Sequence, residues 1–159
     1  MAVWQFRVTL VPKRWLDAGG SVAALVTEEG WDTAIAWLGF PSDTLKERIE
    51  GILPRAKSWS PALTIWGSDD RDDVQLFEEG GTVESLNVRF DLRKPDMKLF
   101  RSVFELSQDC DLAVLDMSRK RTVHDLSDLV RAAAASEAAH FVLDPASFLD
   151  QVGASGRAT

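Results

Sequence analysis

Two stretches of the chain, residues 3–11 and residues 84–92, contain a run that alternates strictly between apolar and polar positions, from residue 4 to 10 in the first and from residue 85 to 92 in the second. In the first stretch, the apolar residues are separated by Gln5, Arg7 and Thr9. A period of two puts one set of side chains on a core and the other set toward water. Both stretches are therefore predicted to be strands of a sheet that is covered on one face.

Two further strands are predicted at residues 63–66 and 74–78, directly before the second alternating stretch. Gly80 and Gly81 separate the last two strands and supply the positive φ that a tight hairpin turn needs. These three strands should therefore form an antiparallel meander. Shorter strands are predicted at residues 31–40 and 111–115.

Apolar residues recur at helical spacing in several segments between the predicted strands. Helices are predicted to begin at Ser21, at Ser42, at Asp96 and at Thr122, the last one running to the region of His140. Strands that are bunched together, rather than alternating with helices, indicate the α+β class. The predicted fold is an antiparallel sheet of about five strands, including the meander, with amphipathic helices packed on one face.

The length and composition are those of one globular domain: 159 residues, of which 45% are hydrophobic and 27% charged. We predict a single α+β domain over residues 1–152 and a small, polar, frayed tail over residues 153–159. The amino end does not have the pattern of a signal peptide, and no apolar run reaches the roughly 18 residues of a membrane span. Cys110 is the only cysteine. The expected compartment is the cytoplasm, while no pattern indicates the oligomeric state.

The net charge of −7 disfavours nucleic acid as a partner, because the phosphates would be repelled. Acidic residues concentrate between Asp69 and Glu84, where seven carboxylates accompany a single base, Arg71. Such a concentration of charge steers association with a basic partner. The acidic residues of this hairpin that we assign to a partner-binding patch are Asp69, Asp70, Asp72, Asp73, Glu78 and Glu79.

The chain has six tryptophans and no tyrosine. Trp66 alternates away from Leu63 and Ile65, so it is predicted to share the outer face of the sheet with Arg89. An aromatic ring beside an arginine is a frequent recognition surface, and both residues are added to the predicted patch. The competing interpretation is that the linker around Trp59 covers Trp66.

The chain contains no motif for catalysis or for a cofactor. The aspartates that start at Asp69 do not match a calcium loop, since its third and sixth positions are Arg71 and Val74. No Gly-x-Ser-x-Gly sequence presents a nucleophile, and neither glycine pair has the context of a phosphate-binding loop. No catalytic residue, metal ligand or cofactor is assigned. A hydrolase that pairs a hairpin carboxylate with Asp91 or Asp116 is an alternative, because carboxylates in unlike surroundings can divide acid and base roles.

Residues 63–93 and the ending Phe141-Val-Leu-Asp-Pro145 resemble small uncharacterised bacterial proteins. Compact acidic α+β domains of this kind also occur among immunity proteins, which neutralise bacterial toxins. The resemblance spans about half of the chain and transfers no functional residue. The leading hypothesis is a non-enzymatic, immunity-like binding protein that meets a basic protein partner through the acidic hairpin and the adjacent sheet face. Binding of a small ligand at the face of Trp66 and Arg89 is a further alternative.

Overall fold

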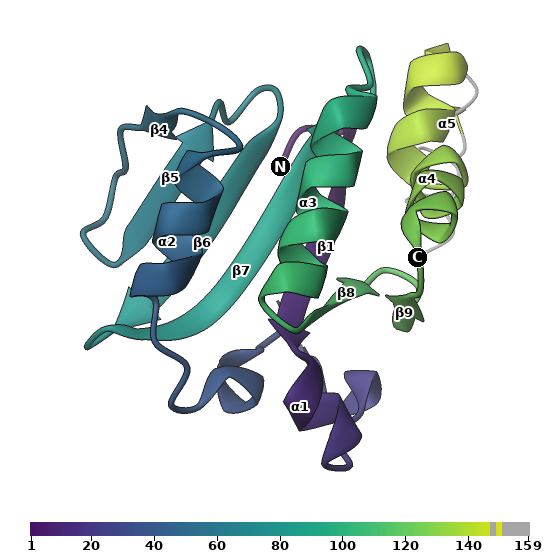
Figure 1. The fold of residues 1–159 in the computed structure, drawn as a ribbon. Helices are drawn as coiled ribbons and strands as arrows, with labels where there is room; N and C mark the ends of the chain where they lie inside the picture. The colour runs from purple at the N-terminus through teal and green to yellow at the C-terminus, as the bar shows by residue number, and fades with distance from the viewer. Residues whose placement is uncertain (147–148, 151–159) are drawn as a thin grey trace.

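The computed structural model describes residues 1–146 and 149–150 and has a seven-stranded antiparallel sheet at its centre (Figure 1). The strand order is β4-β5-β6-β7-β1-β8-β9, so the predicted meander β5-β6-β7 pairs with the first strand of the chain. The strands are β1 (Gln5–Pro12), β4 (Arg55–Ala56), β5 (Leu63–Gly67), β6 (Asp73–Glu79), β7 (Thr82–Asp91), β8 (Leu112–Asp116) and β9 (Arg121–Val123). The α+β class is confirmed. The sheet is larger than expected because β4 and β9 have only two and three residues, too few to show a period.

Helices cover one face of this sheet, which we call the inner face (Figure 1). They are α2 (Asp43–Glu50), α3 (Met97–Asp109), α4 (Leu126–Ala134) and α5 (Glu137–Leu143). Their apolar sides join the inner-face residues of the strands in one buried cluster. α3 begins next to its predicted start, and the Asp96 side chain caps it by accepting a hydrogen bond from the amide of Lys98. Among the described residues, no helix combines the length and the apolar character needed to cross a membrane.

The register of the strands decides which residues share a face. Trp66 pairs with Val74, and both side chains belong to the core on the inner face. The adjacent cross-strand row contains Arg7, Arg89 and Asp73 and therefore lies on the opposite face, which we call the outer face. The prediction that Trp66 shares the outer face with Arg89 is wrong.

The outer face is covered over the end of β1 and over β8 by the segment that follows β1. This segment contains α1 (Lys13–Asp17), η1 (Val22–Leu25), β2 (Val26–Thr27), β3 (Gly30–Trp31) and η2 (Ala34–Trp37). Its residues Leu25 and Ala36 form a second, smaller core with Val11 and Leu115. The apolar cover does not extend over the rest of the outer face. There β1 and β7 carry polar side chains such as Arg7.

Two predicted elements differ from the structure. Residues 31–40, expected as a strand, contribute Trp31 to the two-residue β3 and then form the short 3₁₀ helix η2. Ala36 belongs to the second core and Trp37 to the main core, so two cores share this segment and neither period is visible.

The last predicted helix is the second difference. Thr122, expected as its cap, lies in β9, because this segment pairs with β8. Asp125 caps α4 instead, by accepting a hydrogen bond from the amide of Asp128. The helix then breaks at Ser136, whose side chain caps α5. The predicted tail, residues 153–159, lies outside the described residues.

Candidate functional site

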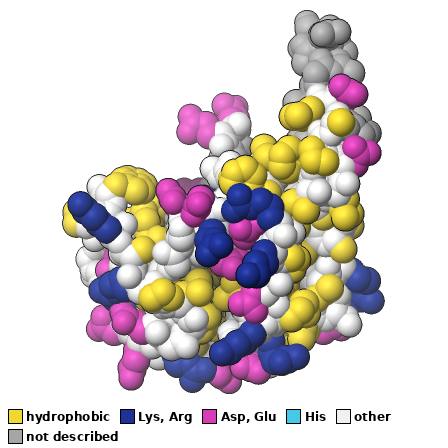
Figure 2. Space-filling view, turned by 90° about the horizontal axis from the view of Figure 1, so that it is seen from above, with side chains coloured by type: hydrophobic (Ala, Val, Ile, Leu, Met, Phe, Trp, Pro, Cys, Tyr) yellow, Lys and Arg dark blue, Asp and Glu magenta, His cyan; other side chains and the backbone are white. Residues whose placement is uncertain are grey.

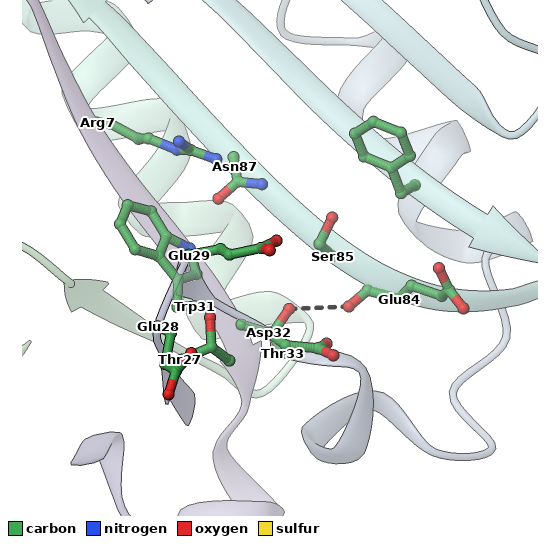
Figure 3. A pocket seen from close by; sticks show the side chains of 11 residues that line it. Arg7, Thr27, Glu28, Glu29, Trp31, Asp32, Thr33, Glu84, Ser85 and Asn87 are labelled. Atoms are coloured by element: carbon green, nitrogen blue, oxygen red, sulfur yellow. Dashed lines mark hydrogen bonds between the residues drawn. The ribbon is translucent and has the colours of Figure 1, made fainter. Parts of the chain in front are cut away.

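A cleft of about 660 Å³ opens on the outer face, next to the edge of the covering segment (Figure 3). Its floor is formed by Arg7 of β1 and by Ser85 and Asn87 of β7. The β2–β3 hairpin forms the opposite wall and contributes the indole of Trp31. A cleft of this volume accommodates a small molecule or a few residues of a peptide.

Arg7 places a positive charge on the cleft floor. Its guanidinium lies over the ring of Trp31, 4.7 Å from the ring centroid. Its Nε is buried and has no hydrogen-bond partner in the part of the chain that the structure describes. Burial lowers the pKa of Arg7, and the nearby charge of Arg89 lowers it further. A guanidinium is charged at any physiological pH, so the floor holds a partly dehydrated cation that is in no ion pair with a carboxylate of the described residues.

Arg89, the cross-strand neighbour of Arg7, is neutralised within the protein. Its Nε donates to Oδ1 of Asp73 at 2.7 Å, and its Nη2 donates to Oδ2 of the same carboxylate. Asp73 is fully buried, and this two-pronged bond raises the pKa of Arg89. Asp73 is therefore engaged by Arg89, and Gln75 donates to its Oδ2 as well.

The rim of the cleft is acidic. Four carboxylates line it, those of Glu28, Glu29, Asp32 and Glu84, and a fifth, Glu79, is hydrogen-bonded to Glu84. We call these five the rim carboxylates. The side chains of Glu79 and Glu84 share a hydrogen bond, which raises the pKa of Glu84 because one carboxyl must hold a proton to donate it. Asp32 adds its charge and raises this pKa further. Within the described part of the chain, none of the rim carboxylates forms an ion pair with a Lys or Arg side chain.

The acidic residues predicted to form one patch are divided between the two ends of β6. Asp69, Asp70 and Asp72 lie in the turn before this strand, and Glu78 and Glu79 lie at its other end. A strand of seven residues places its ends roughly 20 Å apart.

Several of these acids already have partners. Asp73 binds Arg89, and Glu78 forms an ion pair with Lys46 of α2. Figure 2 shows the side of the molecule that is at the top in Figure 1, where basic side chains gather around acidic ones. A second hollow near the β5–β6 turn is likewise lined by both signs of charge, including Arg71 and Lys94. The predicted patch is therefore less uniformly negative than the rim of the cleft.

A ligand cannot reach the side chain of Trp66 from either face of the sheet. Its side chain is fully buried, and Arg55 stacks on its ring at 5.6 Å from the centroid. Trp59, expected as a possible cover, is 78% exposed and contacts Phe77 on the outer face instead. Trp66 is thus a core residue.

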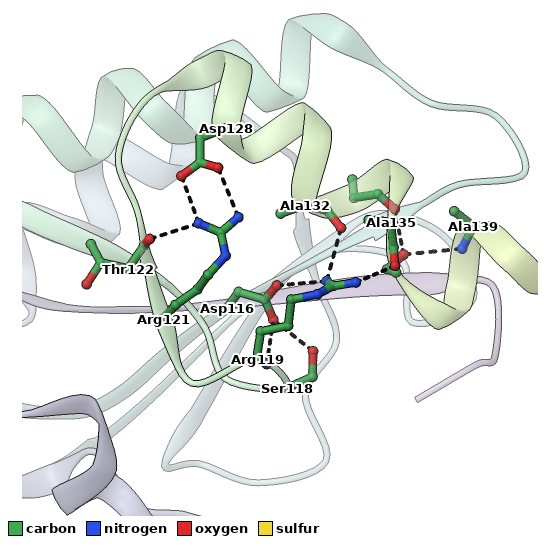
Figure 4. Close-up of polar contacts among 11 residues, drawn as sticks. Asp116, Ser118, Arg119, Arg121, Thr122, Asp128, Ala132, Ala135 and Ala139 are labelled. Carbon is green, nitrogen blue, oxygen red and sulfur yellow. Dashed lines mark hydrogen bonds and ion pairs between the residues drawn. The ribbon is translucent and has the colours of Figure 1, made fainter.

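Asp116, one of the carboxylates considered for catalysis, has a structural role. It is fully buried and accepts hydrogen bonds from Ser118 and Arg119 (Figure 4). The same guanidinium of Arg119 reaches the carbonyl oxygens of Ala132 and Ala135 at the end of α4. Asp116 and Arg119 together tie the helical layer to the end of β8.

Asp72 and Asp91, in contrast, are brought together beside the second hollow, which measures about 520 Å³. Oδ1 of Asp72 accepts a hydrogen bond from the backbone amide of Asp91 at 2.7 Å. Burial is the main cause that raises the pKa of Asp72, whereas the hydrogen bond from Arg93 lowers the pKa of Asp91. Within the described residues, no three His, Cys, Asp or Glu side chains are grouped as a metal site requires.

The cleft residues Arg7, Trp31 and Asp32 were not among the residues predicted to bind a partner. Arg7 stands at a polar position of a predicted strand, which is an ordinary signal for a solvated side chain. Nothing in the linear sequence indicates that the hairpin carrying Trp31 folds over this position. Comparisons with protein-family models, with curated proteins and with solved structures find no significant match for the chain, so its function is argued from this geometry.

Proposed function

We propose that the protein is a non-enzymatic binding protein that captures a basic segment of a protein partner in the cleft on the outer face. The observation that carries this proposal is the ring of five rim carboxylates without ion-pair partners in the described chain. An immunity-like role, in which the partner is a toxin, is the form of this function that the sequence resemblance implies.

Charge and shape both support a basic ligand. Unpaired carboxylates around a concave surface focus a negative potential over the opening, which speeds the encounter with a cation at low salt. Lys and Arg side chains that enter the cleft would find acceptors on the rim without breaking an internal ion pair. The partner class is the one expected from the composition, and Glu79 connects the predicted patch to the cleft through its hydrogen bond with Glu84.

The test compares two variants that remove the same amount of charge from different places. The rim variant carries Asp32→Asn, Glu79→Gln and Glu84→Gln. The control carries Glu47→Gln, Asp69→Asn and Asp70→Asn, three exposed acids away from the cleft. The measurement is the affinity for a fluorescein-labelled oligolysine peptide at low ionic strength.

The rim variant should bind the peptide about tenfold more weakly than the wild type, while the control should change the affinity by about twofold or less. Equal weakening by both variants would show that only the overall charge matters and would contradict a binding site at the cleft. If the control lowered the affinity more than the rim variant, the peptide would bind near Asp69 and Asp70 in the β5–β6 turn instead of at the cleft.

A carboxylate-dependent hydrolase is the second candidate, supported by the opposite pKa shifts of Asp72 and Asp91 beside the second hollow. Asp72 would act as the general acid, because its raised pKa keeps a proton available at higher pH. The wild type should then hydrolyse at least one member of a panel of nitrophenyl esters and glycosides. Asp72→Asn should lower that rate about 100-fold, and a wild type without turnover on the panel would reject this candidate.

A further inference from the structure

Two side chains on the floor of the cleft are arranged to donate hydrogen bonds toward a ligand. The guanidinium of Arg7 lines the cleft and is held in place by the ring of Trp31, and its buried Nε has no acceptor among the described residues. Asn87 uses its Oδ1 to accept a hydrogen bond from Thr9 at 2.7 Å, which leaves its NH₂ group as the part that can meet a ligand. Figure 3 shows both side chains on the same side of the cleft.

None of the described residues forms an ion pair with Arg7. Asp73, which lies in the same cross-strand row, already binds Arg89 through both oxygens. Glu29 lines the same cleft from the β2–β3 hairpin, yet it is not in an ion pair with Arg7 among the ion pairs of the described residues. The guanidinium of Arg7 lines the cleft without an ion pair among the described residues, so an anion that reaches it from the cleft gains a strong, charge-assisted bond.

We propose that Arg7 and Asn87 form a subsite that binds a carboxylate of the ligand, with Trp31 as its wall. This inference rests on the proposed function, because the carboxylate is carried into the cleft by a basic peptide segment. The segment then presents Lys or Arg side chains to the rim carboxylates and one carboxylate to the floor.

The surroundings favour a carboxylate over a phosphate. A phosphate monoester carries close to two negative charges at neutral pH, and the five rim carboxylates would repel it on entry. One guanidinium fork matches the two oxygens of one carboxylate. Two sources supply this group, the side chain of an Asp or Glu within the segment and the carboxylate at the end of a chain.

Short peptides distinguish these sources. The first pair is Lys-Lys-Asp-Lys-Lys and Lys-Lys-Asn-Lys-Lys, both acetylated and amidated. The second pair is acetyl-Lys-Lys-Lys-Ala with a free carboxylate or with an amide. A third probe replaces the Asp of the first peptide by phosphoserine. Binding is measured by calorimetry against the wild type, Arg7→Met and Arg7→Lys, after circular dichroism has shown that each variant is folded.

The wild type should bind the carboxylate member of at least one pair about tenfold more tightly than its neutral counterpart, the gain expected of a charge-assisted bond. This preference should vanish in Arg7→Met and be partly restored in Arg7→Lys. Arg7→Met should still bind the neutral peptides, because the rim carboxylates are unchanged. The Glu29→Gln variant should strengthen the preference, since it removes a carboxylate that lines the same cleft and repels the carboxylate of the ligand.

Other outcomes separate the two proposals. Equal binding of both members in each pair would overturn the subsite and leave the proposed function standing. A preference that persists in Arg7→Met, or tighter binding of the phosphoserine peptide, would also overturn it. If none of the peptides binds the wild type, both the subsite and the capture of a basic segment are contradicted.

Discussion

Arg7 and Arg89 face each other directly across β1 and β7, and only Arg89 of the two has a carboxylate partner in the described structure. Like charges at directly opposed positions of a sheet are unfavourable. Asp73 neutralises one of these two guanidinium groups, and the other is turned to the cleft. A charge kept near a sheet centre without a partner does little for folding, which is why we assign Arg7 to binding and Arg89 to stability.

This difference predicts opposite results for the same substitution at the two positions. Arg89→Met leaves the buried carboxylate of Asp73 without its cation, so it should lower the free energy of unfolding by about 3–5 kcal/mol. Arg7→Met removes a dehydrated, unpaired charge and loses only its stacking on Trp31, so it should change that free energy by about 1 kcal/mol or less. Urea unfolding of both variants provides the measurement. A large loss of stability in Arg7→Met would show that Arg7 is structural.

The shared hydrogen bond of Glu79 and Glu84 predicts a pH dependence of binding. Because the pKa of Glu84 is raised, this group takes up its proton at a higher pH than an ordinary glutamate. The affinity for the oligolysine peptide should therefore begin to fall, on acidification, above the usual range of glutamate. In Glu79→Gln the fall should move to lower pH, since the neighbouring carboxyl no longer raises the pKa. Titration of the peptide at a series of pH values provides the comparison.

The same pair predicts the sign of a stability effect. The folded protein holds the proton of Glu84 more tightly than the unfolded chain, so folding is penalised when both carboxyls are charged. This penalty is complete above the raised pKa and disappears as the pH falls to the ordinary glutamate pKa. Glu79→Gln should consequently gain stability relative to the wild type at neutral pH, and the gain should shrink on acidification. A gain that is independent of pH would argue against the shared proton.

Gly67 is predicted to tolerate no side chain. It ends β5 with φ +89°, and an added Cβ would overlap the carbonyl oxygen of Asp72. Gly67→Ala should destabilise the protein by about 2–4 kcal/mol, from backbone strain and from the displaced turn. Gly19 is the matched control, because it also has a positive φ of +104° but open space around its Cβ position. Gly19→Ala should cost about 1 kcal/mol, as measured by thermal or urea unfolding.

Arg119 is predicted to hold the end of α4 to the sheet. Arg119→Met leaves Asp116 with fewer donors and frees the carbonyl oxygens of Ala132 and Ala135. We expect a loss of about 1–3 kcal/mol in unfolding free energy and faster hydrogen exchange in α4 and α5 than in β7. Lys120→Met, at the exposed neighbouring position, should leave the unfolding free energy and the hydrogen exchange of α4 and α5 unchanged. Uniform loss of protection across the molecule would mean that Arg119 does not act locally.

The sequence by itself determined the elements whose side chains repeat regularly. The two alternating stretches became β1 and β7. Gly80 and Gly81 form the turn between β6 and β7 with positive φ, because only residues without a Cβ adopt it easily. A period of two, however, states only that neighbours point to opposite sides. In β5 both Ile65 and Trp66 are buried, so the pattern could not decide which of them faces the helices, and pairing with β6 did.

The tertiary structure alone decided where the charges act. The count of acids along the chain placed Asp73 and Glu78 in one patch, but their cations come from β7 and from α2, which are distant in sequence. The cleft exists because a hairpin after β1 folds back over polar positions of the sheet. Contacts between distant segments depend on strand register and packing, which local periodicity does not encode, and for that reason the unpaired Arg7 became visible only in three dimensions.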